Sequence, residues 1–310
     1  MKILVTGGAG YIGSVLVPML LAEKHEVTVV DNFMYQQTTL LDVCHHEKLT
    51  IIRGDARDMK LMGSLAKSMD AFIPLACYTG APICSRDPIG AESTNKTAVL
   101  DLLKLKSPSQ MMIFPCTNSG YGVGQTGLHC DENTPMNPIS LYGKWKVETE
   151  QALLATGQVA TFRLATVFGV SPRMRLDLLV NDFTYRAVND RFVVLFEAHF
   201  KRNYLHVRDA ARAFIHTLNH YDKMKGSPYN VGLSDANLSK FELCQAIQKH
   251  IPQFTFLTSE IGEDPDKRNY IVSNAKVEAT GYRTIVSLDA GLKELIKGYQ
   301  IVKRMDYANA

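Results

Sequence analysis

The amino-terminal segment, residues 1–31, carries the pattern that most constrains the fold. A short apolar run over 3–6 predicts a buried strand, and glycines follow it at positions 7, 10 and 13. Residues 14–23 then predict a helix, and residues 25–30 predict a second strand that ends at Asp31. Glycines in such a turn let backbone amides approach a pyrophosphate at the amino terminus of the helix. The unit therefore predicts a dinucleotide-binding site.

The residue that ends the second strand indicates which dinucleotide is bound. The carboxylate of Asp31 can accept hydrogen bonds from the adenosine ribose hydroxyls, and it would repel a 2′-phosphate. No lysine or arginine occurs between Asp31 and Lys48. The sequence therefore predicts NAD, rather than NADP, as the cofactor.

Strand and helix patterns continue to alternate after this unit. Such alternation predicts a parallel sheet with helices on both faces, a Rossmann-type doubly wound α/β fold. We expect an NAD-binding domain over residues 1–168 and a smaller α+β substrate domain over residues 169–310. A helix near 207–221 could return to the first domain. Further strands are predicted over 49–53, 71–75, 111–116 and 160–164, and further helices over 59–68, 90–105 and 139–155.

Tyr142 and Lys146 lie four residues apart in the last of these predicted helices. Side chains with that spacing share one face of a helix, so the ammonium can lower the pKa of the phenol, which is near 10 when free. Parallel strands open their carboxyl ends to one crevice, which brings Asp55, Ala76 and Thr117 toward the same place. A tyrosine, a lysine and a hydroxyl beside a dinucleotide are suited to the oxidation of an alcohol.

Charge and cysteine content argue against several other classes of protein. The 34 basic and 31 acidic residues are nearly balanced and form no run of like charge, so neither a nucleic-acid nor a membrane surface is expected. The six cysteines include no Cys-x-x-Cys pair, and Cys44-His45-His46 has no second cluster, so no metal site is predicted. We find no signal peptide and no run of about 20 apolar residues, and we expect a cytoplasmic protein.

Together these features resemble the extended short-chain dehydrogenase/reductases of the nucleotide-sugar epimerase and dehydratase family. The resemblance rests on the three glycines, Asp31, Gly54-Asp55, Thr117 and Tyr142-x-x-x-Lys146, and it runs along nearly the whole chain. It implies that Tyr142 takes the proton of a sugar hydroxyl held by Thr117, while hydride leaves carbon 4 for NAD. The cofactor contacts it implies are Gly7, Gly10, Tyr11, Ile12, Gly13, Asp31, Asn32, Asp55, Ala56, Leu75, Ala76, Asn95, Tyr142, Lys146 and Ala165.

The two residues after Thr117 reduce the number of reactions that the resemblance allows. Family members that eliminate water carry an acidic pair at this point, whereas this chain has Asn118 and Ser119. Neither side chain can replace a carboxylate as an acid or a base. Members that epimerise carbons 3 and 5 carry a cysteine at the Ser119 position. Oxidation of carbon 4 is left, with the ketone either released or reduced again from its other face; a non-catalytic NAD-binding protein is a third alternative.

The same resemblance extends to the substrate. The segments 117–122, 162–169, 180–187 and 262–268 are most similar to bacterial capsule-biosynthesis members that oxidise a GDP-linked manno-heptose. A nucleotide-sugar substrate, GDP-D-glycero-α-D-manno-heptose, and a homodimer are therefore implied. The diphosphate contacts it implies are Asn181, Arg202 and Arg268, and the sugar contacts are Thr117, Asn118 and Ser119.

Overall fold

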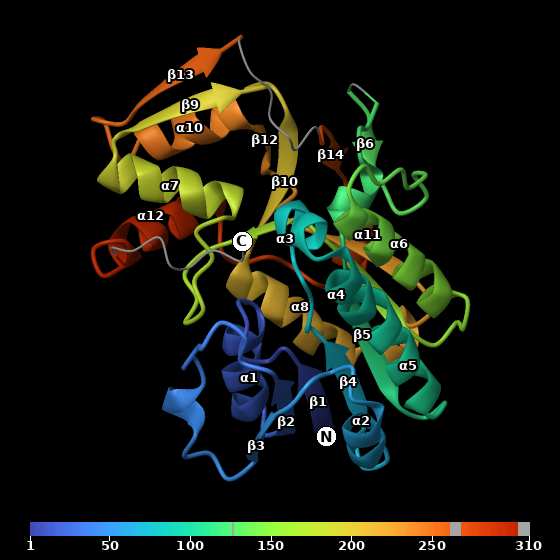
Figure 1. Cartoon of the computed structure of the whole chain (residues 1–310). Helices are drawn as coiled ribbons and strands as arrows, with labels where there is room; N and C mark the ends of the chain where they lie inside the picture. Colours follow the sequence, from blue (N-terminus) through green and yellow to red (C-terminus); the bar gives the residue numbers. More distant parts are fainter. Residues whose placement is uncertain (126, 261–267, 303–310) are drawn as a thin grey trace.

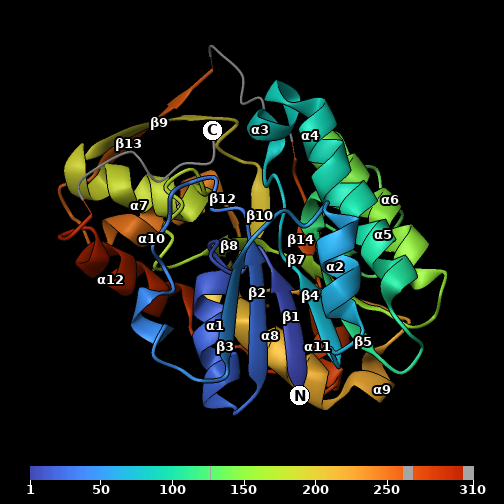
Figure 2. The same ribbon diagram turned by 60° about the horizontal axis from the view of Figure 1, so that its bottom comes forward.

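A computed structural model of the protein describes residues 1–125, 127–260 and 268–302. Its central sheet has seven parallel strands in the order β11-β7-β5-β4-β1-β2-β3, with helices on both faces (Figures 1 and 2). The Rossmann-type α/β fold predicted from the sequence is confirmed. The strands are β1 Lys2–Thr6, β2 Glu26–Asp31, β3 Leu49–Arg53, β4 Ala71–Pro74, β5 Met111–Thr117, β7 Ala160–Leu164 and β11 Pro228–Val231.

Both faces of the central sheet are buried. Ile3 and Val5 of β1 pack into one hydrophobic core and Leu4 packs into another, because side chains alternate across a strand. Helices α1 and α8 cover the first core, and α2, α5 and α6 cover the second. Their bounds are α1 Gly13–Ala22, α8 Val207–Asn219, α2 Met59–Ala66, α5 Ala98–Leu105 and α6 Leu141–Leu154.

Two features of this layer differ from the sequence prediction. The strand β11 was not predicted, because its residues Pro228 and Asn230 interrupt the apolar run that marks the other short strands. The helix predicted over 90–105 is divided into α4 (Pro88–Glu92), a π-helical turn (Ser93–Thr97) and α5. β11 and α8 both follow residue 168, yet β11 is a strand of the central sheet and α8 packs against one of its hydrophobic cores. The division of the chain into two domains at residue 168 stays a prediction.

The second half of the chain builds a separate core beside the sheet (Figure 1). Three helices pack there with a three-stranded sheet, β12-β10-β8, and a two-stranded sheet, β13-β9. The elements are β8 Thr166–Phe168, α7 Leu179–Asn189, β9 Phe192–Phe196, β10 Lys201–His206, β12 Asn237–Ser239, α10 Lys240–Gln248, β13 Thr255–Ser259 and α12 Leu288–Gly298. The remaining elements are η1 Leu41–Val43, α3 Ala81–Arg86, η3 Asn118–Tyr121, β6 His129–Cys130, α9 Tyr221–Met224, β14 Ile271–Val272 and α11 Ala275–Ala279.

In the described ranges, no helix combines the length and apolar character needed to cross a membrane.

Candidate active site

A cavity of about 820 Å³ lies at the carboxyl ends of the central strands. Most of the residues predicted from the sequence line it, although they come from six different strand ends, from the helix α6 and from the second half of the chain. These residues are Gly7, Gly10, Tyr11, Ile12, Gly13, Asp31, Asn32, Asp55, Ala56, Leu75, Ala76, Thr117, Ser119, Tyr142, Lys146, Ala165, Arg202 and Arg268.

The glycine turn after β1 fits the pyrophosphate of NAD. Gly7 has a φ of +70°, and a Cβ built on it would lie 2.5 Å from the backbone nitrogen of Ala76, so no other residue fits there. The helix α1 begins at Gly13, and its N-cap, Ile12, makes no side-chain capping bond. The amides of Ser14 and Val15 already donate to Gly10 O and Ile12 O, whereas Ile12 and Gly13 line the cavity at the positive end of the helix dipole.

The two acidic residues predicted to contact the cofactor, Asp31 and Asp55, occupy different environments. Asp31 ends β2, and its carboxylate accepts hydrogen bonds from the backbone amides of Ala9 (3.0 Å) and Phe33 (2.8 Å). Burial raises the pKa of Asp31 in spite of these bonds. Asp55 lines the cavity next to Ala56, but its carboxylate already holds the Arg57 guanidinium at 2.6 Å. The carboxylate of Asp31 is therefore held in place at the end of β2 by backbone amides, whereas that of Asp55 is paired with a cation.

The predicted catalytic hydroxyl lies at the end of β5. Thr117 is the last residue of that strand, and its Oγ1 accepts a hydrogen bond from the amide of Ser119 at 3.1 Å. The same oxygen donates to Ser119 Oγ at 3.0 Å. Two hydroxyls thus lie together in the cavity, and neither has a carboxylate neighbour in the segment that follows.

Tyr142 and Lys146 come from the first turns of α6, which Ser140 caps by accepting from the amide of Gly143. Lys146 Nζ donates to the backbone oxygen of Pro115 at 2.7 Å and lies over the Phe114 ring. The expected lowering of the phenol pKa by this ammonium is not seen. Burial raises the pKa of Tyr142 well above its ordinary value, and the neighbouring thiols add to the effect. In this structure the phenol is therefore neutral at physiological pH.

Cations from the second half of the chain also line the cavity. Arg202 lies over the ring of Tyr270 at 5.6 Å and donates to the backbone oxygen of Lys201 at 2.8 Å. Arg268 reaches Ser119 Oγ, so it lies nearer the predicted reacting end than a diphosphate ligand was expected to lie. The rest of the segment 262–268, which carries part of the sequence resemblance, lies outside the described residues.

Three predicted contacts do not line the cavity. Asn95 is buried in the π-helical turn, where its amide exchanges two hydrogen bonds with the backbone of Tyr78. Asn181 is also buried, and its amide bonds to Gly169 N (3.0 Å), Arg175 O (2.9 Å) and Tyr11 OH (3.1 Å). Both side chains brace loops that do line the cavity, because their hydrogen-bonding groups are taken up by those loops.

Asn118 is the third such residue, and the prediction that it meets the sugar is not supported by its position. It is 1% exposed, and neither polar atom of its amide has a hydrogen-bond partner among the described residues.

Several lining residues were missed by the sequence prediction. Tyr35 follows β2 and Tyr78 follows β4, so the rule that ligands bind beyond strand ends could have found both. Arg175 also lines the cavity, and it donates to Asp177 Oδ1 at 3.1 Å. Lys240 begins α10 and donates to Phe196 O at 2.8 Å; nothing in its local sequence marks it.

Among the described residues, no group of three or more His, Cys, Asp and Glu side chains is placed so that it could hold a metal ion.

Comparisons with known proteins identify the family of the chain and proteins of similar fold. Residues 3–232 match the model of the "NAD dependent epimerase/dehydratase family". The chain is 27% identical over 310 residues to UDP-glucuronic acid decarboxylase 1 of Xenopus tropicalis, covering 95% of this chain and 71% of that protein. Its fold is similar to UDP-glucose 4-epimerase of Thermotoga maritima with UDP-glucose (25% identity, TM-score 0.85, covering 97% of this chain and 99% of that one). UDP-glucuronic acid 4-epimerase of Bacillus cereus, solved with UDP-glucuronic acid and NAD, is also similar (22% identity, TM-score 0.84, 97% and 98%).

Proposed function

Because the chain belongs to the NAD-dependent epimerase/dehydratase family, we propose that it oxidises carbon 4 of a nucleotide sugar. Bound NAD would accept the hydride. The observation that carries the proposal is that Thr117, Ser119 and Tyr142 line one cavity with the glycine turn and Asp31. The proposed substrate is GDP-D-glycero-α-D-manno-heptose, and the product is its 4-keto sugar for a capsule or another surface polysaccharide.

The protein's own groups have defined tasks in this proposal. Thr117 and Ser119 hold the carbon-4 hydroxyl, since both can donate and accept hydrogen bonds. Tyr142 receives the hydroxyl proton, which requires the phenolate. Lys146 would therefore leave the Pro115 carbonyl and turn toward the phenol, because a nearby positive charge favours the deprotonated form.

Positively charged side chains in the cavity support the proposed binding of a nucleotide diphosphate. Arg202 and Lys240 line the cavity, and a guanidinium with a neighbouring ammonium suits the oxygens of a diphosphate, whereas Arg268 contacts Ser119 at the proposed reacting end. The preference for GDP and a manno-heptose rests on the sequence resemblance alone. The similar proteins reported above act on UDP-linked sugars by their names, so both bases belong in the test.

A second candidate is a 4-epimerase. The similarity to the epimerase of Thermotoga maritima favours it, and an epimerase needs the same first oxidation. The two functions differ in whether the keto sugar leaves or is reduced again from its other face.

The deciding experiment is incubation of the purified protein with GDP- and UDP-linked sugars, followed by mass spectrometry and NMR of the products. Loss of two hydrogens with a ketone at carbon 4 identifies the dehydrogenase. An isomer of unchanged mass identifies the epimerase, and loss of carbon dioxide from a uronic acid identifies a decarboxylase. No change with any sugar, while NAD is bound, would favour a non-catalytic NAD-binding protein.

The role of Tyr142 is tested by Tyr142→Phe. We expect this variant to bind NAD as the wild type does and to lose turnover. A matched control is Tyr299→Phe, which removes a buried hydroxyl outside the cavity that donates to Asn181 O at 2.9 Å. Full turnover in Tyr142→Phe would rule out the phenol as the base.

We also propose a cytoplasmic homodimer, which light scattering of the purified protein and cell fractionation would test.

A further inference from the structure

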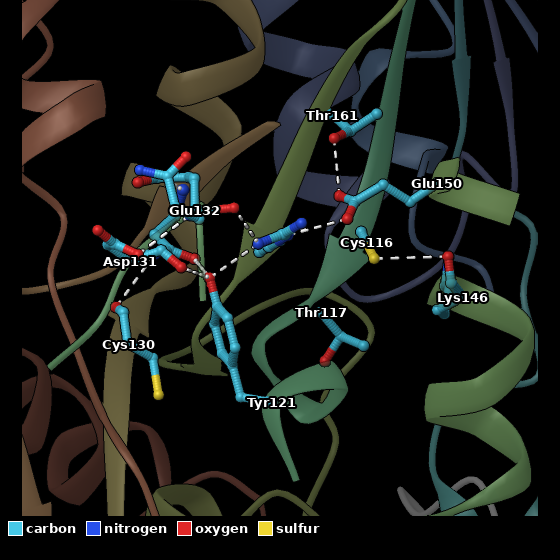
Figure 3. A network of polar contacts seen from close by, with 12 residues as sticks. Cys116, Thr117, Tyr121, Cys130, Asp131, Glu132, Lys146, Glu150 and Thr161 are labelled. Carbon is cyan, nitrogen blue, oxygen red and sulfur yellow. Dashed lines mark hydrogen bonds and ion pairs between the residues drawn. The ribbon is translucent and has the colours of Figure 1, made fainter. Parts of the chain in front are cut away.

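A buried polar network lies behind the cavity and joins α6, β7 and the segment after β5 (Figure 3). Arg163 of β7 donates from Nε to Glu150 Oε2 at 2.8 Å and from Nη1 to Tyr121 OH at 3.1 Å. The other oxygen of Glu150 accepts from Thr161 Oγ1 at 2.7 Å. The side chains of Arg163 and Glu150 are 8% and 1% exposed. None of these residues lines the cavity, so they act on the reaction only through others.

The network connects the two segments that carry the proposed catalytic groups. Tyr121 is four residues after Thr117, at the other end of the short helix η3. Glu150 is four residues after Lys146 and eight after Tyr142, so the three side chains follow one stripe along α6. Arg163 holds Tyr121 and Glu150 at the same time. Its guanidinium therefore spans the gap between the loop of Thr117 and the helix of Tyr142.

A buried charged pair is by itself weak evidence for a stabilising role. Taking two charges out of water costs free energy that their attraction often fails to repay, and well-packed apolar residues can be as stable. The planar guanidinium instead offers several donors at set angles, which fixes its partners in direction as well as distance. A pair of this kind points to a geometric role.

The same tyrosine touches the side of the cavity that comes from the second half. The ring of Tyr121 meets the ring of Tyr270 edge-on at 6.1 Å, and Tyr270 lines the cavity. The Tyr121 hydroxyl has acceptors at 2.8 Å in Asp131 O and Asn230 Oδ1, and Asn230 Nδ2 donates to Ser273 O at 3.1 Å. Arg163 thus holds a tyrosine that also contacts Asp131 and the cavity-lining Tyr270.

We propose that Arg163 is a positioning residue, which sets the separation between the Thr117 hydroxyl and the Tyr142 phenol by holding Tyr121 and Glu150 together. The inference rests on the proposed function, because it assigns Arg163 to the geometry of that same acid–base pair.

The test compares Arg163→Met and Tyr121→Phe with wild type in steady-state kinetics. We expect kcat to fall by about tenfold or more, since a small displacement of reacting groups is costly, while KM and the Kd for NAD stay within about twofold. Arg163→Lys keeps the charge but cannot bond both partners at once, so it should restore little of kcat. The pH at which kcat rises should also move, because the surroundings of Tyr142 change.

Arg212→Met is a matched control. Arg212 of α8 donates to the buried carboxylate of Asp209 at 2.8 Å and lies 6.0 Å from the Tyr282 ring, so it also joins a carboxylate and a tyrosine away from the cavity, although its side chain is 33% exposed and that of Arg163 is 8% exposed. We expect this control to lower the melting temperature and to leave kcat and its pH profile unchanged.

Amide hydrogen exchange gives a readout that needs no substrate. Peptides covering 117–122 and 141–150 should exchange faster in Arg163→Met and Tyr121→Phe, and not in the control. A folded Tyr121→Phe protein with wild-type kcat, pH profile and exchange would overturn the inference, even if Arg163→Met failed to fold. An inactive wild type with the expected exchange would instead count against the proposed function.

Discussion

Tyr11 links the glycine turn to the second half of the chain, and we expect the removal of its hydroxyl to lower the free energy of unfolding. Tyr11 follows Gly10 in the turn between β1 and α1. Its hydroxyl donates to Gly169 O at 2.7 Å and accepts from Asn181 Nδ2 at 3.1 Å, and all three groups are buried. The glycine turn is thereby joined to the segment that follows β8.

The magnitude for Tyr11→Phe follows from the groups left behind. Gly169 O loses a donor in a buried place, and an unsatisfied buried polar group costs about 1–3 kcal/mol. Asn181 Nδ2 still donates to Arg175 O at 2.9 Å, so its loss is partly offset. The ring itself is kept, and no large cavity forms. We therefore expect the free energy of unfolding to fall by about 2 kcal/mol.

Urea unfolding followed by circular dichroism measures this change, and isothermal titration measures the affinity for NAD. We expect weaker NAD binding in Tyr11→Phe, because the turn that faces the pyrophosphate loses a fixed point. The control Tyr299→Phe removes one buried bond, to Asn181 O, without touching the cavity. It should lose stability and keep its affinity for NAD. A change in unfolding free energy below about 0.5 kcal/mol for Tyr11→Phe would refute the reasoning.

Three further predictions concern cofactor binding and pH. Gly7→Ala should be purified without bound NAD, because its Cβ would lie 2.5 Å from a backbone nitrogen at a φ of +70°; stoichiometric NAD would contradict this. Asp31→Ser should bind NAD on the order of tenfold more weakly and discriminate less against NADP, which fluorescence titration of both cofactors measures. Burial opposes ionisation of Glu294, but His206 and Arg208 lower its pKa from 4.5 to about 2. A lowered carboxyl pKa stabilises the fold above pH 4.5, and this contribution is lost as the pH falls toward 2. Glu294→Gln should therefore cost about 1–2 kcal/mol at pH 6, discounted for partial exposure, and the difference from wild type in urea unfolding should shrink as the pH falls from 4.5 toward 2.

Much of the fold and part of the candidate site were predictable because their determinants are local. The strand, glycine turn, helix and strand of residues 1–31 depend on neighbours in sequence, and so does the placement of Tyr142 and Lys146 on one helical face. Once the strands are known to be parallel, their carboxyl ends must lie along the same edge of the sheet. The convergence of Asp31, Thr117 and the glycine turn in one cavity follows from that rule.

Other features depend on contacts between residues far apart in sequence, and only the folded structure decides them. Lys146 meets the Pro115 carbonyl rather than the phenol, and Asn181 faces Tyr11 and Arg175 rather than the cavity. The sequence therefore specifies which chemical groups reach the site, because strand ends and helical faces follow from local pattern. Tertiary packing specifies where those groups point and which partners hold them, because a buried polar side chain must find its partner wherever the fold places one.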